Sequence, residues 1–177
     1  IEQVNTTQLT RFLGKIKSHF NGHLAGKKIA MWGFAFKGGT DDLRDSPGKM
    51  LIDALIAEGA VLHAYDPLAS LRTNDQSNLQ LIASSNAYGA LDGCEALVIT
   101  TDASEFKSPN FEEIRRRLAK PVIFDGKNLY RLDRMVDEGF TYISIGRPQL
   151  RRGQIALKDV GSEILPLENT RGDARAA

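Results

Sequence analysis

Two basic side chains, Lys37 and Arg44, lie close together in a loop that also holds glycines and aspartates. A lysine offers a mobile point charge to a phosphate, and an arginine offers a planar fork of donors. The loop follows an apolar run at residues 29–34 and ends at Ser46-Pro47, a pair that typically begins a helix. Because free N–H groups at a helix N-terminus favour anions, this loop is a candidate phosphate site. The alternative is a surface loop whose basic residues pair with its own aspartates.

A third basic residue, Lys127, follows another apolar run, in the segment Phe124-Asp125-Gly126-Lys127-Asn128. If both runs are strands of one parallel sheet, their carboxyl ends face the same crevice, where such folds bind ligands. We therefore expect Lys37 and Lys127 on adjacent strand ends, an arrangement that suits a diphosphate. The candidate strand ends are residues 36–44, 66–67, 100–104, 125–128 and 146–147.

Residues 33–38 match a loose G-x-A-x-x-G pattern, and Asp66 could act as the ribose-binding acid of a dinucleotide site. The match is weak in two respects. The helix cap at Ser46 comes late, and Asp66 lies 66 − 38 = 28 positions after Gly38, against about 20 in the usual pattern. The sequence therefore favours a turn-forming role for Asp66 over a dinucleotide site of standard form.

Cys94 is the single cysteine, which excludes an intramolecular disulfide, and no Cys/His cluster has the spacing of a zinc site. It precedes an apolar run and has no histidine near it in sequence, so we interpret it as a small thiol that is packed or half-exposed. His19, His23 and His63 show no ligand spacing. We expect no catalytic residue and no metal site in this chain.

The composition indicates one main globular domain, since 177 residues with 42% hydrophobic content can bury a core. Lys and Arg number 23 against 22 Asp and Glu, so nothing points to nucleic acid or an anionic membrane as a partner. No apolar run approaches the ~20 residues of a membrane span, and no signal peptide opens the chain. We expect a cytoplasmic protein, and the start at Ile1 without a methionine suggests a fragment or a processed product.

Apolar residues at helical spacing predict a helical arm over residues 1–20. Strands are then expected at residues 29–34, 61–65, 96–100, 121–124 and 142–145, and helices after Ser46 and at 87–91, 111–118 and 132–138. The short run at 79–83 is either a third strand or a brief pairing segment. This alternation predicts an α/β fold, a Rossmann-like, doubly wound, mostly parallel sheet with an N-terminal helical arm. Residues 149–177 lack periodicity and are expected to form a tail.

Five segments in order give the chain a resemblance to the C-terminal domain of the UDP-glucose/GDP-mannose dehydrogenase family. They are Gly33-Phe34-Ala35-Phe36-Lys37, Thr40 to Pro47, Ala64-Tyr65-Asp66-Pro67, Phe124 to Tyr130, and Ile145-Gly146-Arg147. The similarity runs from about Lys27 to Pro148, and the first helix resembles the end of the family's long connecting helix. The resemblance implies an arm at residues 1–25, a UDP-sugar-binding α/β domain at 26–148 and a tail at 149–177.

Within the family, the UDP-glucose 6-dehydrogenase subgroup fits best, because its members resemble this chain in the Phe-Asp-Gly-basic-Asn strand end. The resemblance implies NAD-dependent oxidation of UDP-glucose to UDP-glucuronate by the full-length enzyme. GDP-mannose dehydrogenases share the Gly-Thr-Asp-Asp-Leu-Arg stretch and stay the alternative, together with UDP-N-acetyl-sugar dehydrogenases.

Carried over by position, the resemblance implies that Phe36, Lys37 and Lys127 contact the UDP-sugar and that Arg44 reaches NAD. Lys127 stands where the family usually has arginine, which keeps the charge but loses the bidentate geometry.

The family's N-terminal NAD-binding domain and its catalytic cysteine have no counterpart in these residues, so the chain alone is expected to be inactive. The expected partners are a nucleotide sugar, that N-terminal domain and further copies of the same subunit. Two other readings stay open: a free-standing nucleotide-binding module, and a domain for subunit assembly through the helical arm.

Overall fold

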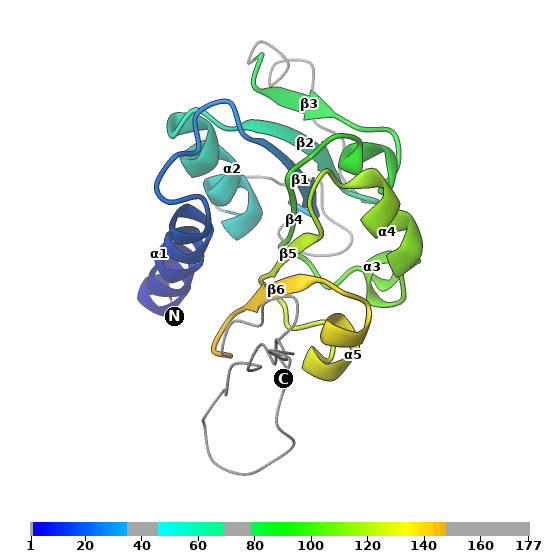
Figure 1. Cartoon of the computed structure of the whole chain (residues 1–177). Coiled ribbons are helices and arrows are strands. Elements are labelled where there is room, and N and C mark those ends of the chain that lie inside the picture. The colour runs from blue at the N-terminus through cyan, green and yellow to red at the C-terminus, as the bar shows by residue number, and fades with distance from the viewer. Residues whose placement is uncertain (1, 35–45, 69–78, 148–177) are drawn as a thin grey trace, which may run out of the picture.

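A single parallel sheet organises the part of the chain that the computed structural model describes, residues 2–34, 46–68 and 79–147. Six strands lie in the order β3-β2-β1-β4-β5-β6 (Figure 1), and every neighbouring pair is parallel. The strands are β1 (Lys28–Trp32), β2 (Val61–Tyr65), β3 (Leu81–Ala83), β4 (Ala96–Ile99), β5 (Val122–Asp125) and β6 (Thr141–Ser144). The strand order reverses direction between β1 and β4, the position where doubly wound sheets bind ligands. The predicted Rossmann-like α/β class is confirmed.

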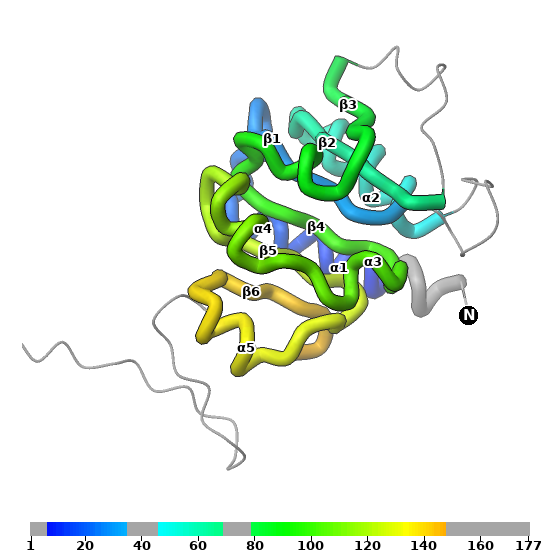
Figure 2. The backbone as a smooth tube through the Cα atoms, turned by 90° about the vertical axis from the view of Figure 1, so that its right-hand side faces the viewer, coloured from blue at the N-terminus to red at the C-terminus, as the bar shows by residue number. Residues whose placement is uncertain are grey.

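Helices cover both faces of the sheet. They are α1 (Glu2–His19), α2 (Pro47–Ala57), the 3₁₀ helix η2 (Gly89–Leu91), α3 (Ser104–Lys107), α4 (Phe111–Arg117) and α5 (Leu132–Asp137). Figure 1 shows α1 and α2 on one face and α3, α4 and α5 on the other, and Figure 2 shows the strands stacked from β3 to β6 with α5 beside β6. The sequence predicts all of these helices except α3, whose four residues are too few to show a period.

Two apolar layers hold the helices on the sheet, because successive strand side chains point to opposite faces. Met31 and Val98 pack in the layer that contains α1 and α2, whereas Trp32 and Ile99 pack in the layer that contains η2, α3, α4 and α5. Three side chains from α1 and the residue after it enter the first layer: Phe12, Ile16 and Phe20. Full burial of one such side chain contributes about 1.5–3 kcal/mol. The α1 helix is therefore bound firmly to the sheet.

The start of α2 packs directly on the end of β1. Ser46 caps the helix by accepting a hydrogen bond from the Lys49 N–H at 3.0 Å, and its hydroxyl donates to the Phe34 carbonyl. Gly48 lies so close to the same backbone that a Cβ there would be 2.6 Å from the Phe34 Cα. The predicted Ser-Pro helix start is confirmed, and it fixes α2 against the exit of β1.

Cys94 lies in the second apolar layer and is fully buried. Its Sγ donates to the Ala90 carbonyl at 3.3 Å. Burial raises the pKa of the thiol to about 12. The interpretation as a packed thiol is confirmed, and the group is a poor nucleophile at neutral pH because the thiolate is the reactive form.

Among the described residues, no helix has the length and apolar character needed to cross a membrane. The same residues contain no group of His, Cys, Asp and Glu side chains that could hold a metal ion.

Substitution of the glycine at the start of α2 should destabilise the fold. Gly48→Ala places a methyl group against the Phe34 backbone, and overpacking of this kind costs about 1–3 kcal/mol. Gly14→Ala is the matched control, because Gly14 lies in α1 with no heavy atom within 4 Å of the added Cβ; alanine there should stabilise the helix by about 0.5–1 kcal/mol. Urea unfolding of the two variants measures both changes, and equal stabilities would contradict the close approach of α2 to β1.

The buried thiol should resist alkylation in the native protein. An ordinary thiol with a pKa near 9.0 forms thiolate as the pH rises toward 9, whereas the raised pKa keeps Cys94 protonated there. Iodoacetamide labelling at pH 8 to 9, followed by mass spectrometry, should therefore be slow in buffer and fast in denaturant. Fast native labelling with a midpoint near pH 9 would show that Cys94 is accessible.

Candidate binding site at the carboxyl ends of the strands

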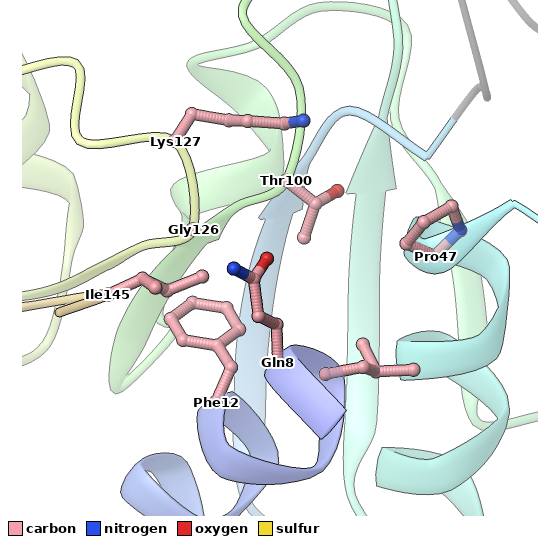
Figure 3. A pocket seen from close by; sticks show the side chains of 8 residues that line it. Gln8, Phe12, Pro47, Thr100, Gly126, Lys127 and Ile145 are labelled. Carbon is pink, nitrogen blue, oxygen red and sulfur yellow. The ribbon is translucent and has the colours of Figure 1, made fainter. Parts of the chain in front are cut away.

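A pocket lies at the carboxyl edge of the sheet, beside the point where the strand order reverses. Its lining comes from five elements or their exits: α1, the start of α2, and the residues that follow β4, β5 and β6 (Figure 3). The lining residues are Gln8, Leu9, Phe12, Pro47, Thr100, Gly126, Lys127 and Ile145. Ligands of open α/β sheets bind at this edge, so the pocket is the candidate binding site.

Lys127 supplies the positive charge of the pocket. Figure 3 shows its side chain extended along the rim toward Thr100, with the amide of Gln8 below it. The side chain is exposed, and its ammonium has no hydrogen-bond or ion-pair partner in the part of the chain that the structure describes. Three donors on an unpaired ammonium are suited to phosphate oxygens.

Gly126 brings the turn after β5 close to both α1 and β4. Its N–H donates to the Ile99 carbonyl at 2.8 Å. A Cβ at this position would lie 2.9 Å from the same carbonyl oxygen and 3.3 Å from the ring of Phe12. A larger residue would push the turn away from the pocket, so glycine sets how near Lys127 lies to the helix.

The exit of β1 is held from two sides. The N–H of Phe34 donates to Asp66 at 2.8 Å, and the Phe34 carbonyl accepts from the Ser46 hydroxyl. Gly33, just before, has a φ of +85° and would meet the side chain of Thr101 if it carried a Cβ. Residues 35–45, which follow, lie outside the described part of the chain.

Asp66 acts as a turn former, as the sequence predicts. Its second oxygen accepts from the Leu68 N–H at 2.9 Å, while the first accepts from Phe34, and the side chain is only 8% exposed. Backbone donors therefore engage both oxygens that a ribose hydroxyl would need. The described residues do not fit a dinucleotide site of standard form.

The expectation that the two basic loops follow adjacent strands is wrong. In the sheet, β4 lies between β1 and β5, so the two exits are about 10 Å apart at the usual strand spacing. The local sequence pattern does not encode the order of the strands. β4 follows β3 in the chain, but in the sheet it lies between β1 and β5. Thr100, at the end of β4, consequently occupies the space between the two exits and lines the pocket.

Of the site residues that the sequence proposes, Lys127 lies on the pocket, whereas Phe36, Lys37 and Arg44 lie outside the described residues. Thr100 belongs to a strand end that the sequence marks as a candidate. Gln8 was missed, because the helical period of the arm does not reveal which strand ends lie beside it. The signal that the sequence offered was a polar side chain at position 8, beside the apolar face of the predicted helix.

Residues 30–132 of the chain match the UDP-glucose/GDP-mannose dehydrogenase family, UDP binding domain. Among curated proteins, the UDP-glucose 6-dehydrogenase of Pseudomonas aeruginosa is 36% identical over 154 residues, which cover 84% of this chain and 34% of that protein. The Rattus norvegicus UDP-glucose 6-dehydrogenase is 35% identical over 161 residues, covering 81% and 32%. The chain thus spans about a third of the length of these relatives.

Solved structures agree in fold. A UDP-D-ManNAc dehydrogenase from Pyrococcus horikoshii superposes with a TM-score of 0.62 at 29% identity, over 78% of this chain and 30% of that one. An NDP-N-acetyl-D-galactosaminuronic acid dehydrogenase from Methanosarcina mazei gives a TM-score of 0.64 at 25% identity, over 80% and 29%. The ordered motifs, the sheet and the family match agree, and the chain belongs to the UDP-glucose/GDP-mannose dehydrogenase family, of whose UDP-binding domain it carries the matching region.

Proposed function

We propose that this chain binds the nucleotide sugar in an NAD-dependent UDP-glucose 6-dehydrogenase, which oxidises UDP-glucose to UDP-glucuronate. One observation carries the proposal: the ammonium of Lys127, which has no partner among the described residues, lies on the pocket at the carboxyl edge of a UDP-binding-domain fold. A UDP group carries a diphosphate, and a charge-assisted hydrogen bond to an ammonium is stronger than a neutral one.

In this proposal Lys127 contacts the diphosphate from the exit of β5. Phe36 and Lys37 approach the same ligand from the exit of β1, across the end of β4. The separation of the two exits suits contacts to different parts of one ligand better than two contacts to one phosphate.

The redox chemistry belongs to groups outside this chain. NAD bound by a partner domain would supply the hydride acceptor for oxidation of the sugar, and Arg44 reaches that cofactor in our proposal. Asp66 is committed to backbone N–H groups and Cys94 is buried and protonated, so neither one acts on substrate. The residues of this chain bind and orient the nucleotide sugar.

We place the protein in the cytoplasm as a homo-oligomer, with residues 1–25 as the end of a connecting helix, 26–148 as the binding domain and 149–177 as a tail. The close fit of α1 against the sheet supports a continuous connection from that helix into the domain.

A UDP-N-acetyl sugar is the second candidate substrate. The curated relatives named above are UDP-glucose enzymes, whereas the Pyrococcus horikoshii structure is of a UDP-D-ManNAc dehydrogenase. GDP-mannose stays a third candidate through the shared family.

Titration of the chain with UDP should perturb the pocket. In ¹H–¹⁵N spectra, the amide signals of Thr100, Gly126 and Lys127 should shift with added UDP and not with uridine, because the diphosphate is the group that meets the ammonium. Lys127→Met should weaken UDP binding about ten- to hundredfold, since a charge-assisted hydrogen bond contributes ~1.5–3 kcal/mol and ~1.4 kcal/mol is tenfold. The matched control is Lys120→Met, because Lys120 pairs with Glu95 and does not line the pocket. Equal affinities of the Lys127→Met variant and the wild type would remove Lys127 from the site.

The choice of sugar can be tested on the full-length enzyme by thermal-shift measurements with UDP-glucose, a UDP-N-acetyl sugar and GDP-mannose. A ligand that binds only the folded state raises the melting temperature by mass action. We expect the largest shift with UDP-glucose at equal concentrations. A larger shift with the N-acetyl sugar would move the protein to the second candidate while leaving the UDP site in place.

A further inference from the structure

Asp125 is a fully buried carboxylate at the end of β5, one residue from the turn that carries Lys127. A buried carboxylate is unfavourable unless donors satisfy it. Asp125 accepts three hydrogen bonds of 2.7 Å, from the Lys127 N–H on one oxygen and from the Leu129 N–H and the Tyr142 hydroxyl on the other. Two of the three donors belong to the backbone of the turn.

Other contacts restrict the same turn. Gly126 donates to the Ile99 carbonyl, and the Asn128 side-chain amide donates to the Ile145 carbonyl at 3.1 Å. Asn128 has a left-handed backbone with a φ of +56°. In the segment 125–130, Lys127 is the one exposed residue, and the others are buried or half-buried. Hydrogen bonds to Asp125, Ile99 and Ile145 therefore hold the turn, while the Lys127 side chain extends from it.

We propose that Asp125 is a positioning residue for Lys127: its carboxylate holds the turn after β5 so that the ammonium faces the pocket. The inference rests on the proposed function in that the anion at the pocket is the diphosphate of a nucleotide sugar. Asp125 touches no ligand in this account and acts only through the backbone of Lys127 and Leu129.

Charge alone cannot explain a carboxylate at this place. A negative group near a phosphate weakens phosphate binding by Coulomb repulsion, so removal of the charge would by itself tighten the complex. If Asp125 instead positions Lys127, removal of the carboxylate should weaken phosphate binding. The direction of the change in affinity therefore separates the two roles.

Tyr142 supports the carboxylate from the neighbouring strand. Burial first, and the nearby Asp125 carboxylate second, raise the pKa of the Tyr142 phenol, so it stays protonated and donates. Tyr142→Phe removes one donor from Asp125 and leaves both backbone hydrogen bonds of the turn in place. Tyr142→Phe should therefore disturb the turn less than a substitution of Asp125 itself.

Asp125→Asn is the stronger variant. It keeps the shape of the side chain but turns one oxygen into an N–H₂ donor, which must face a donor of the turn. At least one of the two turn amides then loses its acceptor. In hydrogen exchange of the free chain, the Lys127 or Leu129 amide should lose protection while the Gly126 amide, bonded to Ile99, keeps it.

The same variant should weaken UDP binding by about the same factor as Lys127→Met, ten- to hundredfold by the conversion used for that variant. Added to Lys127→Met, it should weaken binding little further, because Asp125 acts through Lys127. Such non-additivity between the two substitutions is not expected of a side chain that only stabilises the fold. Tyr142→Phe should give a smaller change in the same direction.

Leu91→Ala is the matched control for lost stability, since Leu91 is fully buried before β4, at the opposite end of the strands. It should destabilise the chain without altering UDP affinity.

Three results with Asp125→Asn would overturn the proposal: unchanged protection of both turn amides, tighter UDP binding, or full additivity with Lys127→Met. If Asp125→Asn does not fold, Tyr142→Phe with wild-type UDP affinity would overturn it as well. Failure of the wild-type chain and the full-length enzyme to bind UDP would overturn the proposed function instead, and the exchange result would still decide whether Asp125 holds the turn.

Discussion

Two buried carboxylates at strand ends determine the shape of the binding edge. Asp66, after β2, accepts the N–H of Phe34 at the exit of β1, and Asp125, at the end of β5, accepts two N–H groups of the turn that follows. Unpaired N–H groups at these exits would be unfavourable in a buried setting. The hydrogen bonds of Asp66 and Asp125 therefore fix the backbone at the exits of β1 and β5. The parallel sheet places both exits on one edge, and helix α1 closes that edge with Phe12 and Gln8.

The order of the strands in the sheet sets the distance between the exits of β1 and β5. Because β4 separates β1 from β5, the exit of β1 and Lys127 lie on two sides of the edge, with Thr100 at the end of β4 between them. A ligand as long as a nucleotide sugar can use both sides at once. The same order puts the amino end of α2, capped by Ser46, beside the pocket through Pro47. The fold thus supplies a cationic rim and an apolar floor, which suits a charged diphosphate attached to larger, less polar groups.

Local features of the fold could be predicted from sequence, and non-local ones could not. The apolar run at residues 96–99, the Ser46 cap and the packed Cys94 each depend on a few neighbouring residues, so the pattern reveals them. Lys127 could be placed at a strand end for the same reason. The position of β4 between β1 and β5, and the contact of Gln8 with the pocket, depend on tertiary packing. The hydrogen bonds of Asp125 were missed, because two of its three donors are backbone N–H groups that no sequence pattern displays and the third, the Tyr142 hydroxyl, comes from the next strand.

In the proposed function, the diphosphate of a nucleotide sugar lies at the carboxyl edge of the sheet, against Lys127. A crystal structure of the protein with bound UDP tests it most directly. We expect a phosphate oxygen about 2.7–2.9 Å from Lys127 Nζ, the usual length for such charge-assisted bonds, with the Asp125 hydrogen bonds to the turn intact. A diphosphate bound away from the exits of β1, β4 and β5, with Lys127 facing solvent, would contradict it.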